Sequence, residues 1–242
     1  MSPISPIRPM SPISPIIKVC GLREADNIRA VDQLLAARAT VNSPLLTAMM
    51  GFIFWEKSSR YVGERPAYLP MNAKRVGVFV DASLDVILQK AEDFGLDFIQ
   101  LHGHESPIFI RALRDKTYGS IGVIKAFNLA SAEDLKLTRP YVGLADYFLF
   151  DTKGKSVGGN GEKFDWSLLD DYDGETPFLL SGGIGPDDAE RVLAFRHPRL
   201  AGIDLNSRFE TAPAQKDINA LRRFLNDLNC KSYNCQNHGE QD

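Results

Sequence analysis

Two segments late in the chain stop at small polar residues or glycine, as phosphate-binding loops do. The apolar run Phe178–Leu180 ends at Ser181-Gly182-Gly183, and a short strand expected over Ala201–Leu205 ends at Asn206-Ser207. Glycines let backbone N–H groups approach an anion closely, and a helix-like segment starting at Pro186 would add the partial positive charge of its N-terminus. An isolated Gly-Gly pair is also compatible with a simple tight turn. The second loop favours a phosphate site formed by both.

Cys20 and Asp151 are the residues best suited to acid–base chemistry, because each ends an expected strand. A free cysteine is often only a small buried hydrophobic residue, but a thiol beside cations can lose its proton and act as a base. Asp151 follows the apolar run YFLF. A carboxyl group partly removed from water holds its proton more readily, which suits a general acid. An N-cap, or a salt bridge to Lys153, is the structural alternative for Asp151.

Other polar side chains near strand ends could bind a substrate. Arg60 lies in the loop KSSRY after the second expected strand, and a guanidinium binds a carboxylate through two parallel hydrogen bonds. His102 and His104, taken alone, are more typical of structural or supporting positions. Lys125 would form a Schiff base only if it points into the barrel described below, and pairing with a carboxylate is the simpler interpretation. Two further candidates are Asp81, after the third strand, and Asp204, in the eighth.

Hydrophobic patterning predicts the elements that must position these side chains. From Ile16 onward, short β-branched runs alternate with amphipathic segments. One such segment, 84–94, has its apolar residues on one helical face and Gly95 where a C-cap belongs. Strands are expected over Ile16–Cys20, Met49–Trp55, Arg75–Val80, Asp97–Leu101, Ile121–Ala126, Asp146–Asp151, Phe178–Leu180 and Ala201–Leu205. Helices are expected over Glu24–Ala37, 84–94, Ser106–Lys116, Ala132–Leu137, 165–170, around 189–193 and over 218–228.

Strand–helix units repeated in this way predict an α/β fold, a single (β/α)₈ TIM barrel with a parallel eight-stranded core. In such barrels the catalytic groups lie at the C-terminal ends of the strands, and paired late loops form the usual phosphate site. A doubly wound open sheet is the alternative. No GxGxxG follows the first strand, and GGNG at 158–161 does not open a strand-to-helix turn. The segment 36–48 is expected to be an inserted loop.

Composition excludes several other classes of protein. The chain has 242 residues, of which 44% are hydrophobic and 24% charged, as in ordinary globular proteins. Its net charge is −3, with both signs interspersed, so no nucleic-acid partner is expected. No apolar run approaches the roughly 20 residues that span a bilayer, and no membrane partner is expected. Three cysteines make no disulfide framework, which indicates a reducing compartment, most simply the cytoplasm. A monomer and a homodimer both remain open.

Both ends of the chain differ in character from the barrel expected over 16–229. Residues 1–15 form a Ser/Pro/Ile repeat in which five prolines exclude a helix, so a disordered, polyproline-II-leaning extension is expected. Such a segment is also compatible with a partner-binding tail.

A flexible polar tail is expected over 230–242. This tail contains Cys230, Cys235 and His238, which lack a fourth ligand at useful spacing and are weak evidence for a metal site. No metal is therefore expected.

Seven motifs, in order, resemble one family. They are KVCGL at 18–22, GFIFWEKSSRYV at 51–62, GVFVD at 77–81, QLHG at 100–103, FDTKGKSVGGNGEKFDW at 150–166, LSGGI at 180–184 and DLNS at 204–207. Together they resemble the phosphoribosylanthranilate isomerase family of tryptophan biosynthesis, from about residue 17 to 228. The resemblance implies an Amadori rearrangement of N-(5′-phosphoribosyl)anthranilate, a phosphorylated small molecule, to 1-(2-carboxyphenylamino)-1-deoxyribulose 5-phosphate, with no cofactor.

The resemblance also implies roles for individual residues. Cys20 matches the family's general base and Asp151 its general acid. Arg60 matches the residue that contacts the anthranilate carboxylate, and His102 a pocket-lining position. The remaining matches are Gly182, Gly183, Asp204, Asn206 and Ser207 at the phosphate end, and Gly159 and Gly161 in a loop that closes over the site.

Two residues depart from the family pattern. Arg208 stands where the family often has glycine, and its side chain could reach the phosphate or point to solvent. Glu162 stands where the closing loop can carry a basic residue, which could weaken attraction for a dianionic substrate. Neither departure removes the acid–base pair.

Two other functions compete with the isomerase. Indole-glycerol-phosphate synthase, another phosphate-handling barrel, needs a catalytic lysine and normally a longer helical N-terminal extension, where this chain has a proline repeat. A non-catalytic barrel that binds a phosphorylated metabolite or a protein predicts loss of the acid or the base, and both are present.

Overall fold

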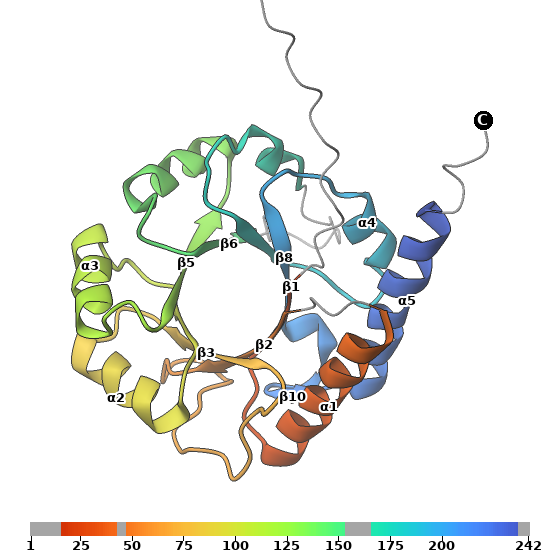
Figure 1. Cartoon of the computed structure of the whole chain (residues 1–242), viewed down its shortest axis with the longest axis horizontal. Helices are drawn as coiled ribbons and strands as arrows, with labels where there is room; N and C mark the ends of the chain where they lie inside the picture. The colour runs from red at the N-terminus through yellow and green to blue at the C-terminus, as the bar shows by residue number, and fades with distance from the viewer. Residues whose placement is uncertain (1–15, 43–46, 153–165, 237–242) are drawn as a thin grey trace, which may run out of the picture.

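Eight parallel strands form a closed barrel surrounded by helices (Figure 1). The computed structural model describes residues 16–42, 47–152 and 166–236. Strand β1 pairs with both β2 and β8, which closes the ring and rules out the doubly wound open sheet. The (β/α)₈ fold is therefore confirmed. The barrel strands are β1 (Ile16–Cys20), β2 (Ala48–Ile53), β3 (Lys74–Phe79), β4 (Phe98–Leu101), β5 (Gly122–Leu129), β6 (Tyr147–Thr152), β7 (Phe178–Ser181) and β8 (Leu200–Leu205).

Alternate residues of each strand face the barrel interior and the surrounding helices. A small apolar cluster fills the interior with Ile16, Met49, Val76, Ile124, Ala126, Leu149 and Leu179, all buried. The larger cluster lies between the strands and the helices and is rich in phenylalanine, including Phe148, Phe150 and Phe178. Parallel strands covered on both sides need this nearly continuous apolar sequence, which explains why the strands alternate so little in polarity.

The helices lie on the outside of the ring and follow the predicted order (Figure 1). Local signals place two of them: the Ser83 hydroxyl accepts from Val86 N at the start of α2, and Gly95, in the left-handed conformation (φ 57°), ends it. Ser106 caps α3 in the same way. The helices are α1 (Ala25–Asn42), α2 (Leu84–Phe94), α3 (Pro107–Lys116), α4 (Ala189–Ala194) and α5 (Ile218–Gln236), with 3₁₀-helices η1 (Ala132–Tyr141), η2 (Trp166–Asp171) and η3 (Ser207–Phe209).

Two sequence-based expectations about local structure are wrong, and one pair of strands was not anticipated. The expected loop over 36–48 is helical as far as Asn42, because α1 continues to that residue. The helix expected from Pro186 begins at Ala189, after a turn in which Gly185 N donates to the Asp188 carboxylate. A short hairpin, β9 (Glu210–Ala212) and β10 (Gln215–Lys216), was not anticipated, since neither strand has an apolar pattern.

The division into extension, barrel and tail stays a prediction. Residues 1–15 lie outside the described part of the chain, and so does the end of the tail, 237–242. Helix α5 continues to Gln236, so 230–236, which we expected to belong to a flexible tail, is helical. Among the described residues, no helix is both long and apolar enough to cross a bilayer.

Candidate active site

The C-terminal ends of β6, β7 and β8 surround a cavity of about 210 Å³. Gly182 and Gly183 both have positive φ (87° and 69°), a conformation that few other residues adopt readily, so the loop after β7 needs glycine there. After β8 the chain turns directly into η3 at Ser207. The cavity is lined by Asp151, Ser181, Gly182, Gly183, Ile184, Asp204, Asn206, Ser207 and Arg208. The two loops predicted to bind phosphate therefore lie side by side.

Asp204 lines this cavity and pairs with a buried lysine. Lys18 Nζ donates to Asp204 Oδ1 at 2.8 Å, and the Lys18 side chain is fully buried. Ser181 Oγ lies 3.4 Å from the other carboxylate oxygen. Burial lowers the pKa of Lys18, but the Asp204 carboxylate and the Cys20 sulfur more than offset it, and the net shift is upward. The Asp204 carboxylate of β8 therefore favours the protonated form of Lys18.

Cys20, at the end of β1, is buried beside Lys18 and is a free thiol. It is not among the residues lining the cavity, although both lie at the C-terminal ends of the strands. Gly51 of the neighbouring strand makes room for it, because a Cβ on Gly51 would lie 2.7 Å from Cys20 Sγ. Burial raises the pKa of the Cys20 thiol and Asp204 adds to that shift, while Lys18 and Lys216 oppose it.

Asp151, at the end of β6, lines the cavity with a side chain that is 30% exposed. His102, at the end of β4, approaches it, with Nε2 3.7 Å from Asp151 Oδ2. Gln100 Nε2 lies 3.0 Å from His102 Nδ1 and holds the opposite edge of the ring. The carboxyl group thus keeps access to the cavity while an imidazole borders it.

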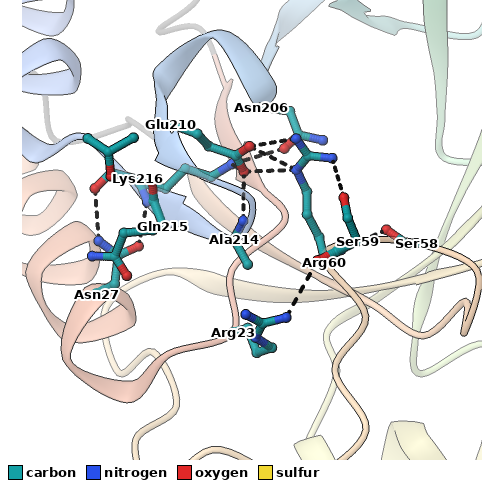
Figure 2. A network of polar contacts seen from close by, with 11 residues as sticks. Arg23, Asn27, Ser58, Ser59, Arg60, Asn206, Glu210, Ala214, Gln215 and Lys216 are labelled. Atoms are coloured by element: carbon teal, nitrogen blue, oxygen red, sulfur yellow. Dashed lines mark hydrogen bonds and ion pairs between the residues drawn. The ribbon is translucent and has the colours of Figure 1, made fainter.

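Arg60 reaches the same end of the barrel and is held there by a buried carboxylate (Figure 2). Glu210 accepts from Arg60 Nη2 at 2.6 Å and from Arg60 Nε at 2.9 and 3.0 Å. The hydrogen bonds to Glu210 raise the pKa of Arg60, the largest of the causes acting on it. Glu210 also accepts from Lys216 Nζ at 2.6 Å. Arg60 is therefore an oriented guanidinium and not a freely solvated loop residue.

Three other candidates from the sequence are not brought into this site. Lys125 lies between the inward-facing Ile124 and Ala126, so it points out of the barrel, where it pairs with Glu105 at 3.2 Å. A Schiff base at Lys125 is therefore ruled out. Asp81 and His104 bind each other, with His104 N 2.5 Å from Asp81 Oδ1. Gly159, Gly161 and Glu162 lie outside the described residues.

Sequence reasoning missed four residues beside the site: Lys18, Gly51, Glu210 and Lys216. Gly51 opens the segment GFIFWEKSSRYV, so its position was visible but its contact with Cys20 was not. Glu210 and Lys216 lie neither in an expected strand nor directly at the end of one. Glu210 contacts Arg60, which is 150 residues away in the sequence. No local pattern carries that information.

In the part of the chain that the structure describes, no cluster of three or more histidine, cysteine or acidic side chains could hold a metal ion. Of the proposed tail ligands, His238 lies beyond the described residues.

Comparison with known proteins agrees with this geometry. The family model for N-(5′-phosphoribosyl)anthranilate (PRA) isomerase matches residues 18–227. The N-(5′-phosphoribosyl)anthranilate isomerase of Phocaeicola vulgatus is 50% identical over 215 residues, which cover 89% of this chain and 98% of that protein. The enzyme of the same name from Parabacteroides distasonis is 48% identical over 218 residues, covering 88% of this chain and 92% of the relative.

Solved structures give the same result. Phosphoribosylanthranilate isomerase of Thermotoga maritima superposes with a TM-score of 0.68 at 28% identity, covering 89% of this chain and 99% of that one. A second solved isomerase, in complex with reduced 1-(o-carboxyphenylamino)-1-deoxyribulose 5-phosphate, has a TM-score of 0.66 at 26% identity over 89% and 99% of the two chains. By sequence and by fold, the chain belongs to the phosphoribosylanthranilate isomerase family.

Proposed function

We propose that this isomerase of tryptophan biosynthesis works with Cys20 as general base and Asp151 as general acid. The observation that carries the proposal is that the ends of β1 and β6 lie at the same end of the barrel as the loops after β7 and β8, the first of which contains Gly182 and Gly183. The reaction converts N-(5′-phosphoribosyl)anthranilate, an aminoaldose, into an aminoketose. It needs one proton delivered and another removed, which a single acid and a single base can do.

In the first step Asp151 protonates the ring oxygen of the ribose. The bond from C1′ to that oxygen breaks, and the nitrogen lone pair of the anthranilate forms a C1′–N iminium. The exposed part of the Asp151 side chain and its place in the cavity wall support this role. His102 borders the carboxyl group and is suited to keeping it oriented during the transfer.

In the second step Cys20 acts in its thiolate form, which is the minor form in the free enzyme at neutral pH, and becomes a thiol by removing the C2′ proton. The electron pair of the C–H bond forms the C1′–C2′ double bond of an enolamine, and the iminium nitrogen becomes neutral. Tautomerisation then adds a proton to C1′ and removes one from the C2′ hydroxyl, which leaves a ketone at C2′. The iminium already acidifies the C2′ proton, so a thiolate is a sufficient base.

Arg60 and the two loops are proposed to hold the opposite ends of the substrate. A guanidinium recognises the anthranilate carboxylate through paired hydrogen bonds, and backbone N–H groups of Gly182 and Gly183 suit a phosphate. The related isomerase solved with a phosphorylated, carboxyphenyl-containing analogue supports such a substrate here. Gly159 and Gly161 are proposed to belong to a loop that closes over the substrate.

The direct test of function is turnover of freshly generated phosphoribosylanthranilate by the full chain, followed by loss of anthranilate-type fluorescence. The expected result is saturable turnover without added metal or organic cofactor. A folded chain with no turnover would contradict the assignment and favour a barrel that only binds a phosphorylated ligand.

The protonation state of Cys20 in the free enzyme follows from its surroundings. Burial raises the pKa of the thiol above its ordinary value, so the neutral thiol should dominate at neutral pH and the thiolate should increase as pH rises. We therefore expect the midpoint of the Cys20 titration to lie above the ordinary pKa of a free thiol. Ultraviolet thiolate absorbance, taken as the difference between the parent chain and its Cys20→Ala variant, isolates this group. A midpoint below the ordinary thiol pKa would mean that Lys18 and Lys216 outweigh burial.

Arg208 is expected to strengthen phosphate binding. It lines the cavity, and its Nε would be 2.6 Å from a Cβ on Gly185, so the side chain lies against the loop that follows β7. Arg208→Gln should weaken inhibition by inorganic phosphate by about tenfold, the magnitude of a lost charge-assisted hydrogen bond. Arg223→Gln removes the same charge from an exposed position on α5 and serves as the control. Equal inhibition constants in both variants would place Arg208 in solvent.

The proposed setting of the enzyme is the cytoplasm, as a monomer or homodimer acting on a free metabolite. The low cysteine count and the free thiol at Cys20 support a reducing compartment. Light scattering of the purified chain would decide between the two oligomeric states.

A further inference from the structure

Glu210 and Lys216 form a buried ion pair beside the active site, in the hairpin after η3. Their side chains are 4% and 0% exposed, and neither residue lines the cavity. Removing two charges from water is costly, and apolar residues of similar size often stabilise a fold as well or better. A stabilising effect alone therefore does not explain why a buried ion pair lies beside the site.

Glu210 occupies one edge of the Arg60 guanidinium and leaves the other edge open. It engages Nε and Nη2, the side edge of the planar group. Among the residues that the structure describes, the end edge, formed by Nη1 and the second N–H of Nη2, makes one hydrogen bond, from Nη1 to Ser59 Oγ at 3.4 Å. A guanidinium can bind one carboxylate on each edge. Glu210 thus fixes the plane of Arg60 while its free edge remains available to a second carboxylate.

Lys216 determines which way the Asn206 amide faces. Its ammonium donates to Asn206 at 2.9 Å, and an ammonium has no lone pair to accept with. The Asn206 atom that it contacts must therefore be Oδ1. Figure 2 shows the amide nitrogen directed away from Lys216. Because Asn206 lines the cavity, its NH₂ group is left as a donor for a phosphate oxygen.

The Glu210–Lys216 pair also links Arg60 and Asn206, which lie on either side of the end of β1. A Cβ on Gly21 would lie 2.6 Å from Arg60 Cδ and 2.7 Å from Asn206 Oδ1, so the residue after Cys20 runs between them. Asn27 of α1 anchors the hairpin, with its amide donating to Lys216 O at 2.9 Å and accepting from Lys216 N at 2.8 Å. Arg60, Glu210 and Lys216 together carry one net positive charge next to the thiol.

We propose that Glu210 and Lys216 are positioning residues that orient Arg60 and Asn206, and thereby hold the carboxylate and phosphate ends of the substrate on either side of Cys20. This inference rests on the substrate contacts proposed above for Arg60 and Asn206. It assigns neither residue a contact with the substrate.

Two variants test the role of Lys216 and the role of Glu210 separately. Lys216→Met keeps the length of the side chain and frees the Asn206 amide to turn its oxygen toward the phosphate. We expect the KM for substrate and the inhibition constant of inorganic phosphate each to rise by about tenfold or more. Glu210→Gln frees Arg60 and should raise KM by a similar factor of about ten, with a smaller change in phosphate inhibition. In both variants kcat should fall much less than KM rises.

Lys125→Met is the matched control, because it breaks another buried Lys–Glu pair, on the outer face of β5. It should lower the melting temperature as Lys216→Met does and leave KM and phosphate inhibition at wild-type values. Melting temperatures and circular dichroism show which variants are folded. If Lys216→Met does not fold, Asn206→Asp, which replaces the NH₂ donor with an oxygen, should weaken phosphate inhibition by about tenfold.

The outcomes distinguish this inference from the proposed function. A wild-type chain that neither turns over substrate nor is inhibited by phosphate would defeat the proposed function itself. An active wild type, with folded Lys216→Met and Glu210→Gln variants that keep its KM and phosphate inhibition, would overturn the positioning role alone. If the Asn206→Asp variant is folded and its inhibition by phosphate is unchanged, the positioning role of Lys216 would be overturned.

Discussion

Replacing Cys20 with serine is expected to lower kcat by about 10²-fold or more, within the range that a positioned general base contributes. Serine nearly preserves the size of the side chain, so the pocket beside Gly51 remains filled. A hydroxyl, however, gives up its proton far less readily than a thiol does, even next to the Lys18 ammonium. The C2′ proton would then have no adequate acceptor, and the step from iminium to enolamine would limit the rate.

The measurement is steady-state turnover by fluorescence loss, with binding of inorganic phosphate as an independent readout. Phosphate binding should be unchanged in Cys20→Ser, because that subsite is built from the loops after β7 and β8. Cys230→Ser, the same substitution in the last helix, should retain full turnover. Retention of kcat within about threefold in Cys20→Ser would exclude the thiol as the base and leave only a packing role for Cys20.

Asp151→Asn is expected to lower kcat by about 10²-fold or more through loss of the general acid. The amide has nearly the shape of the carboxyl group and still lines the cavity, but it cannot deliver a proton to the ribose ring oxygen. Opening of the ring would then depend on water. Substrate binding should change much less, so the loss should appear in kcat rather than KM.

Asp146→Asn provides a control at the other end of the same strand. Asp146 precedes β6 and accepts from Arg114 Nη2 at 2.9 Å and from Val123 N at 2.7 Å, far along the strand from the mouth of the barrel. This variant should lose some stability and keep its kcat. If Asp151→Asn and Asp146→Asn had the same kcat, the acid would have to be another group.

Much of the fold could be predicted because its signals are local. Strands β1 to β8 are short apolar runs, and Ser83, Gly95 and Ser106 sit at helix ends where capping residues belong. In a parallel barrel all strands point the same way, so a residue that ends a strand lies at the mouth wherever it occurs in the chain. That rule predicts that Cys20, His102, Asp151 and Asn206 share one end of the barrel before any contact is known.

One question that the sequence left open and one expectation that was wrong have different physical reasons. The direction of the Lys125 side chain was left open. Alternate residues of a strand face the interior and the exterior of the barrel, and only the register against the neighbouring strands decides which residues face inward. The register of β5 against β4 and β6 places it outside, against Glu105. The helix expected at Pro186 begins at Ala189 because the chain first closes a turn in which Asp188 accepts from Gly185 N.

By itself, the sequence determined the barrel, the order of its strands and the catalytic candidates at their ends, because these follow from hydrophobic period and position in the chain. Only the tertiary structure decided the state and orientation of those candidates. The buried thiol of Cys20, the guanidinium of Arg60 fixed by Glu210 and the Asn206 amide fixed by Lys216 each depend on residues from different strands and loops. Electrostatics and hydrogen bonding act through space, and only closure of the barrel brings these groups within reach of one another.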